Sequence, residues 1–66
     1  MIYKTIHVEN TFEAGVAIGS LRAFLAGQEA GELNIVCELD MLVEVEIACY
    51  SHLVMAYVED KLADFV

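Results

Sequence analysis

The chain has 66 residues, of which 59% are apolar, and it carries a formal net charge of −8 at pH 7. Eight acidic residues and no basic one lie between Arg22 and Lys61. Because the whole chain has only three lysines and arginines, we expect it to bind neither nucleic-acid phosphates nor anionic membranes.

The length predicts a single domain, 1–66. A folded domain of this mass exposes roughly 4,200 Å², which is a large surface for so few residues. Such a monomer cannot enclose all of its apolar side chains, and apolar surface left outside is typical of interfaces. We therefore expect a homo-oligomer, most simply a two-fold dimer.

The cysteines and the hydropathy pattern indicate a cytoplasmic protein with reduced thiols. Cys37 and Cys49 are too few for a disulfide framework, and the N-terminus does not resemble a secretory signal. The longest apolar stretch, Ala14 to Gly27, is interrupted by Arg22 and three glycines. It is too short to span a bilayer.

The first element expected is a strand from Ile2 to Val8. Its residues alternate between two sides, and several are β-branched or aromatic. A helix is expected to begin at Asn10 or Thr11, because Asn10 stands three residues before Glu13 as in a capping box. The helix is expected to end at Gly27 or Gly31.

Apolar residues in this helix recur at helical spacing and predict two neighbouring stripes. One stripe contains Ala14, Ile18, Leu21 and Leu25, and the other contains Phe12, Val16, Gly19 and Ala23. Gly15, Gly19 and Ala23 are spaced by four, which allows another backbone to approach closely. Since a glycine inside a helix costs about 1 kcal/mol relative to alanine, we assign these three small residues to an oligomer interface.

Residues 33–49 alternate with a period of two, which predicts extended structure with one buried face. We divide the stretch near Asp40 to Leu42 into two strands joined by a loop of three residues, which would keep the odd residues on one face. Two alternatives are a helix capped by Asp40 that runs to the C-terminus, and one long strand shared across a dimer.

From Ser51 onward the period becomes helical. Val54, Val58, Leu62 and Phe65 form its apolar stripe. The elements together predict an α+β fold in the order β-α-β-β-α, with both helices packed on one face of a short sheet. With a long C-terminal helix the order would instead be β-α-β-α.

A metal site would have to use Cys49 and His52, which a helix would place on one face. Cys37 and His7 could complete a set of four ligands. Structural zinc sites usually contain two close pairs, whereas only one is present, so we expect neither metal nor cofactor. The cysteines are then small buried apolar residues, and a small metal-binding protein is an alternative.

Nothing in the sequence indicates an enzyme. Catalysis by paired carboxylates requires a recess around them, which the sequence does not predict. Ser51 and His52 are neighbours in the chain, but a nucleophile and its base are brought together by the fold and rarely by sequence adjacency.

The acidic residues of the two-strand region suggest the function. Glu38, Asp40, Glu44 and Glu46 would share one face, and Tyr50 could anchor a partner beside them. We expect a small acidic regulator or inhibitor that occupies a basic surface of a partner protein. Inhibitors and adaptors, including viral ones that disable host enzymes, often have this size and charge, although that is an analogy alone. The alternative is an assembly protein whose homo-oligomerisation is itself the function.

Overall fold

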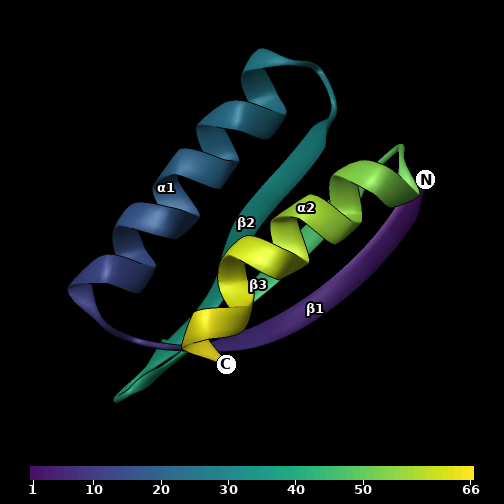
Figure 1. Cartoon of the computed structure of the whole chain (residues 1–66). Helices are drawn as coiled ribbons and strands as arrows, with labels where there is room; N and C mark the ends of the chain where they lie inside the picture. Colours follow the sequence, from purple (N-terminus) through teal and green to yellow (C-terminus); the bar gives the residue numbers. More distant parts are fainter.

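The computed structural model describes residues 1–66 and contains three strands and two helices (Figure 1). Along the chain these are β1 (Ile2–Glu9), α1 (Phe12–Gly27), β2 (Gly31–Leu39), β3 (Leu42–Cys49) and α2 (His52–Leu62), followed by a 3-10 turn at Ala63–Phe65. The α+β fold and the β-α-β-β-α order are therefore confirmed. The alternative with a long C-terminal helix is wrong, because the second helix begins at His52 and not at Asp40.

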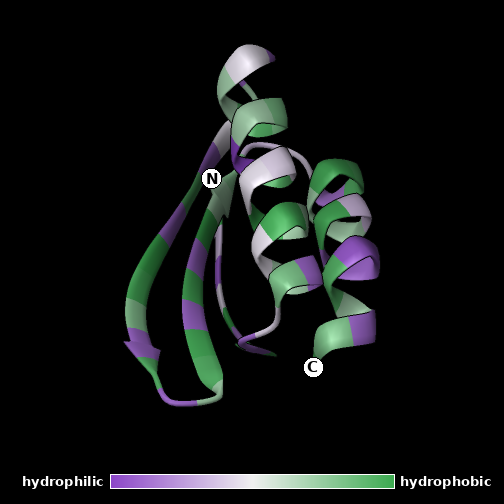
Figure 2. Cartoon of the chain, turned by 90° about the vertical axis from the view of Figure 1, so that its left-hand side faces the viewer, coloured by the Kyte–Doolittle hydropathy of each residue, from purple (hydrophilic) through white to green (hydrophobic).

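The strands form an antiparallel sheet in the order β1-β3-β2. Figure 2 shows the molecule edge-on as two layers, with both helices on one side of the sheet and nothing on the other. We call the uncovered side the open sheet face. Its residues alternate with the core residues along each strand, as the pleat of a sheet requires.

The core lies between the sheet and the helices, and all 13 of its buried residues are apolar. On α1 the buried residues are the predicted stripe of Ala14, Ile18, Leu21 and Leu25. On α2 they are Met55, Val58 and Leu62, while the predicted Val54 and Phe65 are only partly buried. The chain exposes 4340 Å², close to the area expected from its mass.

The first helix begins one residue later than a cap at Asn10 would require. Thr11 is the N-cap, and its Oγ1 accepts a hydrogen bond of 3.0 Å from the backbone N–H of Ala14. Asn10 instead holds the β2–β3 turn, because its side-chain amide donates to the Asp40 carbonyl and its backbone N–H donates to the Met41 carbonyl. The capping box expected of Asn10 is therefore wrong, although Asn10 fixes where α1 starts relative to the hairpin.

In the connection from α1 to β2, a glycine allows the chain to lie close to β3, and a glutamate adopts the left-handed conformation that reverses the chain direction. The helix ends at Gly27, but the residue in the left-handed region is Glu29, at φ 52°. Gly31, at φ 152°, lies so close to β3 that an added Cβ would overlap the carbonyl oxygen of Ala48. Only glycine fits there, since it lacks the Cβ.

The β2–β3 hairpin differs from the expected one in where its extra residue lies. Only Asp40 and Met41 separate the strands, and Leu39 pairs with Leu42, so the three-residue loop is wrong. Asp40 adopts φ 52°, a conformation that aspartate tolerates better than most residues, which explains a turn without glycine, asparagine or proline.

The additional residue is a β-bulge at Val36, where the register between β2 and β3 shifts. Before the bulge Ile35 pairs with Val45, and both belong to the helix side; after it Glu38 pairs with Val43, whose side chain is buried under the helices. The bulge therefore moves Cys37 and Leu39 to the open sheet face and Glu38 to the helix side.

Candidate functional site

No element of the fold covers the open sheet face (Figure 2). Four carboxylates lie on it, at Glu9, Glu32, Glu44 and Glu46, as their places in the strand register show. Polar groups from β1 and β2 lie between them, namely Tyr3, Thr5, His7 and Asn34. Because β3 is the central strand, Glu44 and Glu46 lie at the middle of this face.

All lysines and arginines of the chain belong to the opposite, helical side. Lys4 points toward α2, where its Nζ lies 3.0 Å from Oε1 of Glu59. Arg22 on α1 donates from Nε to the Leu33 carbonyl over 3.2 Å, and Nζ of Lys61 lies 5.5 Å from the ring centroid of Tyr57. The open sheet face consequently has carboxylates and no lysine or arginine.

His7 is the one imidazole on this face, and it contacts a carboxylate across the strands. Its Nε2 lies 3.1 Å from Oε2 of Glu44, its partner across β1 and β3. Both side chains are substantially exposed, so solvent and salt screen the interaction. The pair orients the Glu44 carboxylate toward β1 without removing it from solvent.

Tyr3 and Glu46 form the second cross-strand contact of the open sheet face. Tyr3 is opposite Ala48 and thus diagonal to Glu46 on the same side of the sheet. The Glu46 carboxylate raises the pKa of the Tyr3 phenol above its ordinary value of 10.0, first by accepting a hydrogen bond from it and also by its negative charge, with a further contribution from desolvation.

Of the residues predicted to bind a partner, only Glu44 and Glu46 lie together on the open sheet face. Asp40 occupies the hairpin turn and Tyr50 lies beyond the other end of β3, where it lines a shallow hollow with Glu32 and Ala48. The two residues are therefore at opposite ends of the sheet.

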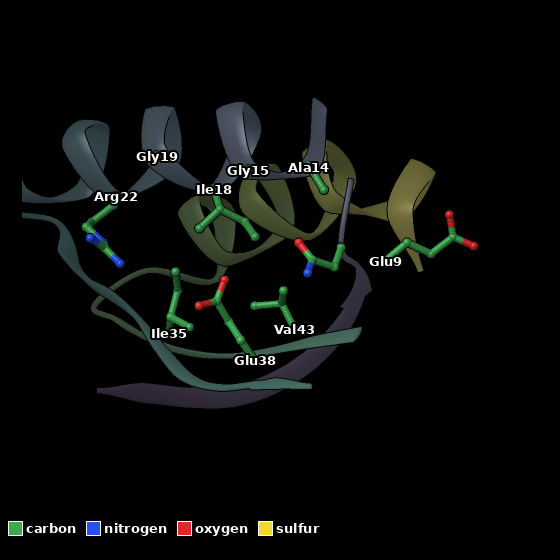
Figure 3. Close-up of a pocket in the computed structure, with 10 residues that line it drawn as sticks. Glu9, Ala14, Gly15, Ile18, Gly19, Arg22, Ile35, Glu38 and Val43 are labelled. Carbon is green, nitrogen blue, oxygen red and sulfur yellow. The ribbon is translucent and has the colours of Figure 1, made fainter. Parts of the chain in front are cut away.

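Glu38 is on the helix side, so the expectation that it shares a face with Glu44 and Glu46 is wrong. Figure 3 shows its carboxylate pointing toward α1, with Ile35 and Val43 close by. The cause is the bulge at Val36, which reverses the side-chain alternation for the last residues of β2.

The same bulge creates an apolar region that sequence reasoning missed. Leu39 and Leu42 pair at the hairpin end of the open sheet face, and they are 67% and 55% exposed. Together with Cys37 they line a small hollow of about 140 Å³ that reaches His7 and Glu44. The acidic face thus ends in an apolar margin, so that carboxylates able to steer a cationic partner lie beside apolar side chains that the partner could bury.

A second hollow, of about 200 Å³, lies between α1 and the hairpin. Gly15 and Gly19 line it from the helix, and Arg22 and Glu38 border it with opposite charges (Figure 3). A Cβ added to either glycine would meet no atom within 4 Å. No other element of this chain approaches the glycines closely. The close backbone approach that their spacing allows therefore does not occur within the monomer.

The candidate metal ligands do not converge. Cys49 ends β3 in the core, where its Sγ donates to the Ser51 carbonyl over 3.3 Å, while His52 begins α2 and is exposed. The two residues do not share a helix, so the one-face arrangement that a helix would give them does not occur. No group of three or more His, Cys, Asp and Glu side chains has an arrangement that could hold a metal ion.

The chain matches no protein family model, no curated protein and no solved structure. Its two helices are both too short, or insufficiently apolar, to cross a lipid bilayer.

Proposed function

We propose that the chain is a small acidic regulator that binds a basic surface of a partner protein through its open sheet face. The observation that supports this most is the segregation of charge. Glu44 and Glu46 occupy the centre of an uncovered face without lysine or arginine, whereas Lys4, Arg22 and Lys61 are on the other side.

Such a face attracts cationic surfaces over a distance comparable to the Debye length, and like charges on it repel until a partner neutralises them. Apolar side chains at the hairpin end, Leu39 and Leu42, add burial after the charges have met. Binding would block whatever the basic surface of the partner normally contacts, so inhibition needs no chemistry from this chain.

The test reverses two charges on the open sheet face and compares the effect on binding with that of two charge reversals on the helical side. Glu44→Lys with Glu46→Lys changes the net charge by four units, and so does Asp60→Lys with Asp64→Lys on the helical side. We expect only the first pair to abolish salt-sensitive capture of a basic protein from lysate and to slow its association. Equal losses in both pairs would show that net charge matters and that the face does not.

A second candidate function is assembly, in which self-association is the activity. The observation that favours it is the apolar outer surface of α1, where Phe12 is 86% exposed. Size measurements in solution distinguish it from the first, because an assembly protein would bind itself and no cationic protein.

A further inference from the structure

The outer surface of α1 lacks the charge that the exposed side of a helix normally carries. At about 100° per residue, Phe12, Val16 and Ala23 lie within about 40° of one another, opposite the buried stripe of the helix. Phe12 is 86% and Val16 is 54% exposed, and Gly19 lies on the flank of the same side, where it also lines the hollow toward the hairpin. We call Phe12, Val16, Gly19, Ala23 and Ala26 the outer stripe.

Most of the helix is apolar, as the green and near-white colouring that dominates it in Figure 2 shows. Glu13 and Arg22 are its only charged residues. A helix with this composition is ordinarily buried on all sides, yet only one side of α1 is buried within the chain. The other side therefore lacks a covering partner in the monomer.

We propose that a second copy of this chain covers the outer stripe, with the two α1 helices antiparallel about a two-fold axis near Gly19. The sizes of the side chains favour this direction. Phe12 and Val16 are large and lie toward the N-terminus, whereas Ala23 and Ala26 are small and lie toward the C-terminus. Antiparallel pairing places each large residue of one copy against a small residue of the other, and Gly19 against Gly19.

The charges limit which surface a second copy can use. Two chains with a net charge of −8 repel each other, so self-association requires contact through a surface without carboxylates. The outer stripe itself contains no carboxylate, whereas the open sheet face has four. A carboxylate beside the stripe is that of Glu38, in the hollow that Gly19 also lines and that Arg22 borders. In the antiparallel arrangement the two Glu13 side chains lie at opposite ends of the helix pair, roughly 18 Å apart along the axis.

The required area is within reach of the helical side. A standard interface buries about 800 Å² on each partner, which is a little under one fifth of the 4340 Å² that the chain exposes. The outer stripe is continued toward α2 by Phe24 and Tyr57, whose rings lie 5.4 Å apart, and by Leu53, which is 81% exposed. The dimer would leave both open sheet faces directed outward, which would allow bivalent binding of a partner. This bivalent binding rests on the proposed function, whereas the dimer itself does not.

The first test introduces charge into the stripe. Ala23→Glu should raise the dimer dissociation constant about 100-fold or more, since two carboxylates would be buried without partners. Asn34→Glu adds the same charge to the open sheet face and should leave dimerisation within about threefold of the parent. Sedimentation of the parent as a monomer at high micromolar concentration overturns the proposal, and so does equal weakening by Asn34→Glu. Far-UV circular dichroism establishes that both variants fold.

The second test reads the direction of the helices and does not depend on destabilising the dimer. In a Cys37→Ser background, Gly19→Cys should form a disulfide with its own copy on mild oxidation, and a mixture of Phe12→Cys with Ala26→Cys should form a mixed disulfide. Phe12→Cys alone should not link, because the two positions would be about 21 Å apart. Efficient linking of Phe12→Cys alone, or none by Gly19→Cys, overturns the antiparallel pairing.

Discussion

Lys4 reaches from β1 to Glu59 on α2, with 3.0 Å between Nζ and Oε1, so the only lysine or arginine of the sheet lies on the helical side. Thr5, the next residue, points to the opposite side and faces Glu46 across the strand pair. One position of strand alternation therefore decides whether a lysine joins or avoids the acidic face.

Exchanging these neighbours, Lys4→Thr with Thr5→Lys, leaves composition and net charge unchanged but moves the cation to the open sheet face. We expect the association rate with a cationic protein partner to fall, while the free energy of unfolding changes by less than about 1 kcal/mol because the Lys4–Glu59 pair is exposed. Stopped-flow association at two salt concentrations checks this. An unchanged rate would mean that the face is not where the partner binds.

Tyr3 provides a pH readout of the same face. Its phenol has a raised pKa, so the neutral form is favoured by folding; the associated stability is present below pH 10.0 and is lost as the pH rises through the folded-state value. In a Tyr50→Phe, Tyr57→Phe background, ultraviolet titration should show Tyr3 ionising at a higher pH than a free tyrosine. Glu46→Gln should move the transition downward, and Asp60→Asn, on α2, should not.

Gly31 and Gly15 should respond in opposite directions to the same change. Gly31→Ala should destabilise the fold by more than about 2 kcal/mol, because the added methyl overlaps the Ala48 carbonyl of β3. Gly15→Ala adds a methyl that meets no atom within 4 Å, and it should stabilise α1 by up to about 1 kcal/mol. Urea unfolding of both variants measures the difference, and a loss of stability in Gly15→Ala would indicate a contact that the isolated chain does not make.

Glu29 is held in a left-handed conformation that glycine adopts at no cost, at φ 52°. Glu29→Gly should therefore increase the free energy of unfolding by about 1 kcal/mol. Gln28→Gly, one residue earlier and at φ −95°, gains no such relief and should be neutral or destabilising. Thermal unfolding midpoints of the two variants, measured at equal protein concentration, give the comparison.

The elements could be predicted from the sequence because hydrophobic periodicity reflects the buried face of each one. Ala14 and Leu25 are buried as their spacing predicts, and Val43 and Ile47 are buried on the face that alternation assigns to them. The positions of these side chains follow from one large contribution to the folding free energy, the burial of apolar area, which acts on every residue of an element in the same way.

The details that shape the candidate site depend on single residues and weaker terms. Val36 is an unpaired bulge residue, and the turn at Asp40 has two residues where three are expected. Each of these changes reverses the side-chain alternation once, so from Ile35 backward the residues again lie on the predicted faces. The alternation pattern therefore reveals neither change. Strict alternation therefore predicts the wrong face for Glu38. The apolar margin at Leu39 was missed as well, since strict alternation counted it among core residues.

The bulge at Val36 and the inward lysine of β1 have a shared consequence for assembly. β1 and β2 are both edge strands, and each has a feature that opposes addition of a further strand: a charge directed inward on one, and an irregular hydrogen-bonding edge on the other. Growth of the sheet from copy to copy, the route to fibrils, is discouraged at both ends. A short and largely apolar chain can in this way bind partners through its helices and its sheet face without polymerising through its edge strands.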